Sequence, residues 1–223
     1  MEIKDLKILL EEFGDNVRFE YDLKKKNWFN IGGKSKVYYK ANNLKDLVNF
    51  LKKLNNREKI FTLGAGSNTL INDNLFNGVV IKLSSKFSYI KQLEKNVLEV
   101  GAGTLDKTLS RYAAEHSIID FEFLSCIPGS VGGTIRMNSG CYGNEISNIL
   151  ISVKALDFKG NLIEIKRDKI KFAYRGTNLP ENLILLSAKL SAKNGDTNLI
   201  NEKILKFNKE KKESQPSQIK TCG

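Results

Sequence analysis

Residues 127–143, which read IPGSVGGTIRMNSGCYG, hold five of the chain's 17 glycines. Glycine loses more backbone entropy on folding than any other residue, so a tight turn would account for one or two of them but not for five. Two shorter segments of the same kind lie upstream, IGG at 31–33 and GAGSN at 64–68. Backbone without a Cβ comes close to a ligand and can turn consecutive amides toward phosphate oxygens. The three segments together favour one extended phosphate-bearing ligand; the alternative is three separate structural turns.

Neither glycine segment has the form of a common nucleotide-binding loop. GAGSNT lacks the third glycine of the G-x-G-x-x-G dinucleotide fingerprint, and GSVGGT lacks the G-K-[ST] ending of a phosphate-binding loop. The ligand site is therefore predicted to belong to another fold.

Arg175 is the second residue whose setting suggests chemistry. It lies in KFAYRGTN, among apolar and small residues and just before Gly176. A planar guanidinium is the natural partner of a carboxylate or of a developing enolate. The alternative is an ordinary surface arginine.

The sequence offers little support for a metal site or for catalysis by histidine. The three cysteines, Cys126, Cys141 and Cys222, form no C-x-x-C pair, and the single histidine, His116, lies in a predicted helix. A structural metal site would lack ligands, and we predict neither a metal centre nor histidine acid–base catalysis.

Composition suits a globular protein of one large or two small domains, with 223 residues, 41% hydrophobic and 27% charged. No apolar run approaches the roughly 18 residues of a membrane span, and no signal-peptide core is found, so we predict a cytoplasmic protein. The net charge of +11 includes lysine runs at 24–26 and 209–212. Such runs usually form solvated faces, but they also attract polyanions: nucleic acid, a nucleotide cofactor or a nucleotide-linked substrate.

Hydrophobic periodicity predicts a mixture of helices and strands, an α+β architecture. Helices are expected at the N-terminus, at 44–54, after Thr104 as N-cap, and at 199–213. Strands are expected at 60–63, 78–83, 97–100 and 183–190, with a hairpin at 151–166. Soft boundaries near 84 and 192–198 divide the chain into 1–83, 84–197 and 198–223.

Four motifs in the same order and spacing resemble one family. NWFNIGG, LGAGSNTLI, IPGSVGGTIRMNSGCYG and FAYRGT are similar to those of the UDP-N-acetylenolpyruvoylglucosamine reductases (MurB), in their shorter type II form, over nearly the whole chain. The resemblance implies an FAD-binding PCMH-type (vanillyl-alcohol-oxidase-like) fold of two α+β subdomains with the flavin between them. Another flavoprotein of that superfamily is the alternative.

The resemblance also implies the site. In the family, NADPH reduces FAD, and the flavin passes hydride to the enolpyruvyl group of a UDP-sugar, which gives UDP-N-acetylmuramate for peptidoglycan. Arg175 matches the arginine that binds the substrate carboxylate and steadies the enolate. The positions implied to bind FAD are Ile31, Gly32, Gly33, Gly64, Ala65, Gly66, Ser67, Asn68, Pro128, Gly129, Ser130, Gly132, Gly133, Thr134, Asn138, Gly140 and Gly143. The UDP-sugar is the implied partner, with no nucleic acid or membrane, and the full-length protein is expected to be a monomer.

The chain departs from the family pattern in two ways. Ser139 and Cys141 stand where alanine is usual, and Arg136 where tyrosine or another residue is common. The sequence then ends ESQPSQIKTCG, with Gly223 aligned just before the family's proton-donating serine. We therefore expect a truncated chain without that serine, the family's C-terminal glutamate and most of the substrate domain. This leaves open an inactive FAD-binding remnant and, from charge alone, a basic nucleic-acid-binding protein.

Overall fold

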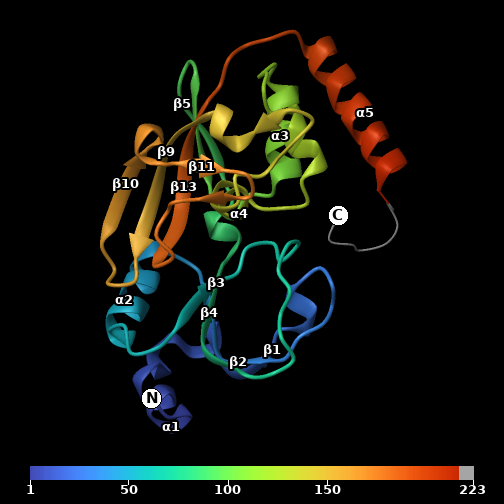
Figure 1. The fold of residues 1–223 in the computed structure, drawn as a ribbon. Helices are drawn as coiled ribbons and strands as arrows, with labels where there is room; N and C mark the ends of the chain where they lie inside the picture. Colours follow the sequence, from blue (N-terminus) through green and yellow to red (C-terminus); the bar gives the residue numbers. More distant parts are fainter. Residues whose placement is uncertain (216–223) are drawn as a thin grey trace.

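The computed structural model describes residues 1–215. Two β-sheets form its framework, and helices cover them (Figure 1). Within residues 1–215 no helix is long and apolar enough to cross a membrane.

The first sheet has four strands in the order β1-β2-β4-β3. Strand β1 is antiparallel to β2, whereas β2, β4 and β3 run parallel. The bounds are β1 (Val17–Asp22), β2 (Lys34–Ala41), β3 (Ile60–Thr62) and β4 (Phe76–Leu83). Alternation of side chains sends Val37, Tyr39, Val79 and Ile81 to one face, where they are buried. Helices α1 (Ile3–Leu9) and α2 (Leu44–Leu54) cover that face.

The second sheet is antiparallel throughout, in the order β10-β9-β13-β6-β5. Its strands are β5 (Ile90–Glu94), β6 (Val97–Gly101), β9 (Leu150–Asp157), β10 (Leu162–Lys166) and β13 (Leu183–Ser191). Helices α3 (Asp106–Glu115) and α4 (Val131–Arg136) pack against it in the larger core cluster. Leu156, Ile184 and Leu186 belong instead to the core of the first sheet. The two sheets therefore share buried apolar surface.

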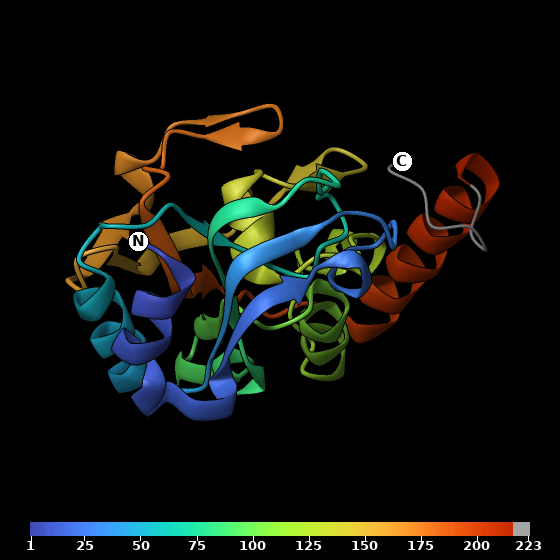
Figure 2. The same cartoon turned by 90° about the horizontal axis from the view of Figure 1, so that it is seen from below.

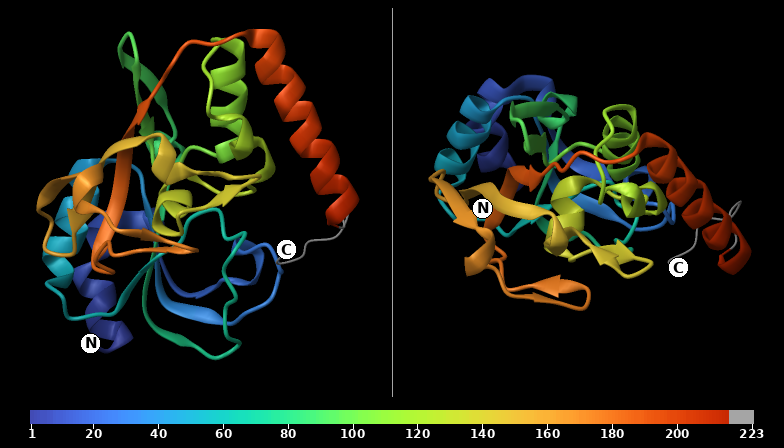
Figure 3. Two further views of the ribbon diagram at one scale, coloured as in Figure 1. Left: turned by 45° about the horizontal axis from the view of Figure 1, so that its top comes forward. Right: turned by 90° about the horizontal axis from the view of Figure 1, so that it is seen from above.

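The remaining elements are short, apart from one long helix. Helix α5 (Thr197–Ser214) runs along the outside of α3 (Figure 3). Two small hairpins are β7 (Gly140–Cys141) with β8 (Asn144–Glu145), and β11 (Phe172–Ala173) with β12 (Gly176–Thr177). The β11–β12 hairpin projects from the body of the protein (Figure 2). Turns of 3-10 helix are η1 (Glu11–Asn16), η2 (Lys24–Lys26), η3 (Ser85–Phe87), η4 (Glu122–Cys126), η5 (Ile146–Asn148) and η6 (Arg167–Lys169).

Helix α2 shows how the sequence fixes an element. The Asn43 side chain accepts a hydrogen bond from the amide of Asp46 at 2.9 Å, which caps the N-terminus. The helix ends where Asn55 adopts a left-handed conformation (φ 48°). The predicted helix at 44–54 is confirmed, with Leu47, Phe50 and Leu51 fully buried.

The other expected elements are found within a residue or two, with one error and several omissions. Thr104 does not cap α3: the N-cap is Leu105, without a side-chain bond, and the Thr104 hydroxyl donates to the carbonyl of Tyr89 at 3.2 Å. The tertiary bond to Tyr89 uses the hydroxyl that a cap would need. Strands β1, β2 and β5, helix α4 and the two small hairpins were not predicted. The positions of Cys222 and Gly223 lie outside the described residues.

Candidate functional site

The two longer glycine segments meet in space. Gly64 follows β3, and Ser130 is the residue before α4. A Cβ added to Gly64 would lie 2.9 Å from the Ser130 hydroxyl oxygen. Segments 66 residues apart, one after a strand of the first sheet and one before a helix that packs on the second, therefore form a common seam.

The loop at 64–68 is held from behind by residues 26–31. The Trp28 amide donates to the Gly66 carbonyl at 2.8 Å, and the Asn27 side chain donates to the Ile31 carbonyl at 2.6 Å. Gly66 has φ +77° and lies so close to the Lys26 carbonyl that a Cβ would clash. Within residues 1–215 the amides of Gly64 to Asn68 form no hydrogen bond. The loop is thus fixed by its carbonyls and flanks and leaves its donors free.

The segment IGG packs against residues 71–74. Gly32 has φ +117°, and the Gly33 amide donates to the Asn72 carbonyl at 2.9 Å. A Cβ at Gly32 would lie 2.6 Å from the Cβ of Ile71, and one at Gly33 would meet the Asp73 carbonyl. Packing on 71–74 accounts for both glycines. The predicted role of Ile31, Gly32 and Gly33 in cofactor binding stays a prediction.

Residues 127–134 pack against the segment that follows β6. The Gly132 amide donates to Ala102 at 2.9 Å, the Val131 amide to Thr104 at 2.9 Å, and the Asp106 amide to the Gly129 carbonyl at 3.2 Å. A Cβ on Gly132 would lie 3.1 Å from that of Ala102. By contrast, a Cβ on Gly133 would have only the Ser130 hydroxyl near it, at 3.7 Å, and a Cβ on Gly143 would have no atom within 4 Å. Gly133 and Gly143 therefore have room that the chain itself does not fill.

Asp106 is a fully buried carboxyl directly beneath this segment. Its Oδ2 accepts from the Thr134 hydroxyl at 2.6 Å and would lie 2.5 Å from a Cβ on Gly129. Its Oδ1 has no partner within the described residues. Burial raises the pKa of Asp106 to about 7, against the lowering effect of the Thr134 bond. Sequence reasoning missed this residue, because an aspartate in the first turn of a helix looks like an ordinary helix-end charge.

Lys82 brings a positive charge to the loop at 64–68. Its ammonium donates to the Gly64 carbonyl. Burial and, secondarily, the charge of Lys26 lower the pKa of Lys82. Within residues 1–215 no carboxylate forms an ion pair with it. A half-buried cation without an anion at a loop with free amides is electrostatically suited to an anionic ligand.

Arg175 lies at the tip of the β11–β12 hairpin with φ +56°, next to Tyr174, and is exposed. Its Nη1 donates to the Gly140 carbonyl at 3.4 Å. Asn138, buried and also left-handed (φ 43°), donates to the Ala173 carbonyl at 3.2 Å. The structure therefore brings Arg175 to the second half of the 127–143 segment.

Arg136 fixes the chain between that hairpin and β13. It donates to the carbonyls of Leu179 at 2.9 Å, Pro180 at 2.7 Å and Leu183 at 2.8 Å. Burial lowers the pKa of Arg136. The departure from the family pattern at this position thus has a structural role.

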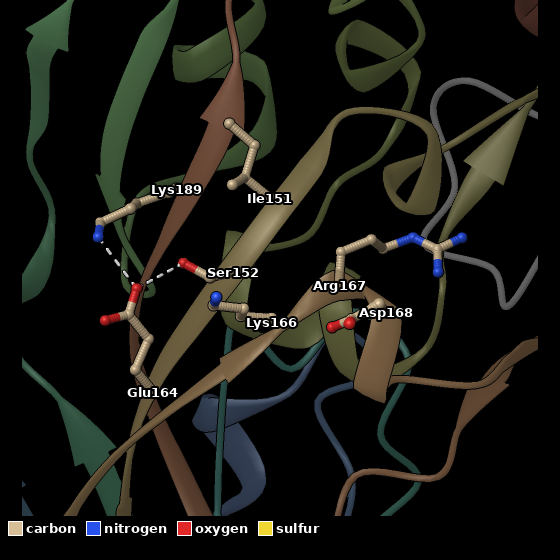
Figure 4. A pocket seen from close by; sticks show the side chains of 7 residues that line it. All are labelled: Ile151, Ser152, Glu164, Lys166, Arg167, Asp168 and Lys189. Atoms are coloured by element: carbon tan, nitrogen blue, oxygen red, sulfur yellow. Dashed lines mark hydrogen bonds and ion pairs between the residues drawn. The ribbon is translucent and has the colours of Figure 1, made fainter.

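The hollow drawn in Figure 4, about 430 Å³ in volume, lies elsewhere, on β9, β10 and β13. Among its lining residues, Glu164 accepts from the Ser152 hydroxyl at 2.8 Å and from Lys189 at 3.0 Å. None of the predicted site residues lines it. Within residues 1–215 no three His, Cys, Asp or Glu side chains are grouped to hold a metal ion.

Comparison with known proteins assigns the fold and the family. Residues 35–166 match the FAD binding domain family. The chain is 45% identical to UDP-N-acetylenolpyruvoylglucosamine reductase of Pelagibacter ubique over its whole length, which covers 74% of that protein. It is 38% identical to the reductase of the same name from Rickettsia canadensis, over 92% of this chain and 69% of the relative.

The chain belongs to the UDP-N-acetylenolpyruvoylglucosamine reductase family. A solved structure of this reductase, MurB from Thermus caldophilus, superposes with a TM-score of 0.80 at 27% identity and covers 93% of this chain and 73% of that one. A BBE-like protein from Physcomitrella patens matches at a TM-score of 0.58 and 15% identity, over 85% of this chain and 44% of that one, which shows the fold alone. The predicted family, the α+β FAD-binding fold and the class of FAD-dependent oxidoreductases are confirmed.

Proposed function

We propose that this chain binds FAD along the seam between Gly64 and Ser130. We further propose that it serves the reaction of its family, the NADPH-dependent reduction of enolpyruvyl-UDP-N-acetylglucosamine to UDP-N-acetylmuramate. The approach of Gly64 to the Ser130 hydroxyl carries this proposal, because it joins the loop after β3 and the segment before α4 into one surface. Family membership supplies the substrate class.

The residues at the seam fit such a cofactor. The free amides of 64–68, with the Lys82 ammonium beside Gly64, match the charge of a diphosphate. The open backbone at Gly133 and Gly143 leaves space for a flat group to come close. We assign the diphosphate to 64–68 and the rest of the cofactor to the predicted positions in 128–143.

When bound, FAD would supply a two-electron carrier between NADPH and the enolpyruvyl double bond. The residues of this chain would position the substrate against the cofactor and polarise it. We propose that Arg175 binds the substrate carboxylate and stabilises the negative charge that develops as hydride arrives. Its bond to the Gly140 carbonyl and the Arg136 bonds to 179–183 would hold the hairpin near the cofactor.

Single-turnover kinetics test the assignment of Arg175. The protein is loaded with FAD, reduced anaerobically with NADPH or dithionite, and mixed with the enolpyruvyl sugar. Loss of one electrostatic donor typically costs about 100- to 1000-fold in rate, so Arg175→Met should slow flavin reoxidation by that order. Arg111→Met, an exposed change on α3, is the control. Equal rates for Arg175→Met and the parent chain would contradict the role.

The same experiment separates the alternatives. Substrate-linked reoxidation supports the reductase, and a yellow protein that NADPH and the sugar leave unchanged supports an FAD-binding remnant. A protein that takes up no flavin contradicts both. Cytoplasmic location, a monomeric state, the absence of nucleic-acid and membrane partners, and the ranges 1–83, 84–197 and 198–223 stay predictions.

A further inference from the structure

Two cysteines stand at either end of the glycine-rich segment. Cys126 closes η4 and directly precedes Ile127, and Cys141 lies in β7. The Cys141 thiol donates to the Phe123 carbonyl at 3.2 Å. In a 3-10 turn, residues three apart stack over each other, so this contact brings Cys141 next to Cys126. Strand β7 and the turn η4 also pack against each other.

The charges around the pair favour one thiolate and one thiol. The Lys211 ammonium, on α5, donates to the Cys126 carbonyl, and Lys107 adds a second positive charge nearby. The neighbouring Cys141, with the Ser125 hydroxyl and these lysines, lowers the pKa of Cys126 against the effect of burial. The neighbouring Cys126 and burial raise the pKa of Cys141. A thiolate stabilised by a neighbouring thiol and cations is the reactive form of cysteine.

We propose that Cys126 and Cys141 form a dithiol–disulfide site that reacts with low-molecular-weight disulfides and, when oxidised, ties together the two ends of the glycine-rich segment. The Cys126 thiolate attacks one sulfur of the disulfide and releases the first thiolate. Cys141 then gives up its proton, and its sulfur attacks Sγ of Cys126 and releases the second thiolate. One disulfide is reduced to two thiols while the cysteine pair is oxidised.

Access to the pair depends on α5. Cys126 is 4% exposed and Cys141 is half-buried. Among the described residues of α5 only Ile200 is buried, whereas Leu205 is 70% exposed. Helix α5 is held by the buried Ile200 and by stacking of Phe207 on Tyr142. Its polar contacts are the Lys211 bond, the ion pair of Lys203 with Glu122 and the contact of Thr197 with the Ser117 hydroxyl. A shift of this helix would admit a small disulfide.

Thiol mapping tests the site without reference to flavin. The Cys222→Ala chain, which keeps only the pair, is equilibrated at graded ratios of reduced to oxidised glutathione, quenched with acid, alkylated and digested. We expect a peptide that links Cys126 to Cys141, two hydrogen atoms lighter than the reduced pair and restored by dithiothreitol. The chains with Cys126→Ala or Cys141→Ala added should yield only glutathione adducts. Free thiols, adducts or intermolecular links in Cys222→Ala at every ratio would overturn the proposal.

The second half of the proposal rests on FAD binding at the seam. Oxidation should slow release of FAD severalfold, because the tie restrains residues 127–140, and the Cys141→Ala, Cys222→Ala chain should show no such change. Equal release rates for the oxidised and reduced pair would overturn the link to the glycine segment. Failure of both forms to bind FAD would instead contradict the proposed function, since the disulfide would still form.

Discussion

Asp106 is a fully buried carboxyl group that lies under the backbone of Gly129. One of its two oxygens has no hydrogen-bond partner among the described residues. Its pKa is about 7 in the folded protein and near 4 in an unfolded chain. Between these values the folded protein holds a proton that the unfolded chain has released, so the free energy of unfolding falls as pH rises through this window.

Asp106→Asn should therefore stabilise the protein above pH 7 and much less at pH 4. The amide oxygen can still accept from Thr134, while the buried charge is gone. The expected gain is on the order of 2–4 kcal/mol, from three pKa units at most. Urea unfolding of both chains across this pH range measures it, with Asp15→Asn, on an exposed residue, as control. A gain that does not change with pH would contradict the account.

Lys82 should matter for FAD and not for folding. Hydrogen bonds to charged groups contribute about 1.5–3 kcal/mol, so Lys82→Met is expected to weaken FAD binding about 10- to 100-fold. Removal of a half-buried unpaired cation should leave the free energy of unfolding of the apoprotein equal or higher. Equilibrium titration with FAD checks this, with Lys86→Met, on exposed η3, as control. Equal weakening in both variants would indicate a nonspecific charge effect.

The sequence indicated that the glycines matter, but it did not indicate the different structural reason for each one. Gly32, Gly66, Gly132 and Gly143 are explained by left-handed backbone or by close contact with the chain itself, whereas Gly133 has neither reason and faces open space. Composition could not separate these groups, because each depends on which distant residue packs behind it. Lys82 and Asp106 were missed for the same reason.

Helix α4 and the chain before β13 are joined by one side chain. Arg136→Lys keeps the charge but cannot reach the carbonyls of Leu179, Pro180 and Leu183 together, because lysine lacks the planar fork. We expect a loss of about 1–3 kcal/mol in the free energy of unfolding. Denaturant unfolding beside Arg111→Lys, an exposed change, measures this. A loss no larger than that of the control would show that the three bonds contribute little.

Local signals were enough for most elements. Helix α2 carries its own cap and apolar stripe, and the β9–β10 hairpin turns at Gly160 with φ +89°, so both could be predicted from the sequence. Strands β1 and β2 lack such a signal: they enclose the loop from 23 to 33, which is ordered by bonds to distant residues such as Gly66 and Asn72. Thr104 failed as a cap for a similar reason, since Tyr89 holds its hydroxyl.

The molecule as a whole is two sheets that share a core and meet at the glycine seam. Leu156, Ile184 and Leu186 of the second sheet pack into the core of the first. The sequence predicted two α+β parts but not this shared core. The buried residues of β9 and β13 reach the first sheet only once β13 has paired with β6 and β9, and these pairings join residues far apart in the chain. The seam is thus fixed by the packing of one sheet on the other.

Titration of the apoprotein with FAD, in the parent chain and in Gly133→Leu, tests the central claim most directly. Gly133 has an ordinary φ and only the Ser130 hydroxyl near it, so a larger side chain should be tolerated by the fold. It should nevertheless fill the space proposed for the cofactor. We predict one tightly held FAD in the parent chain, and at least about 10-fold weaker binding in Gly133→Leu with unchanged unfolding of the apoprotein, a difference of about 1.4 kcal/mol. A parent chain that binds no FAD, or equal affinity in the two chains, would contradict the account.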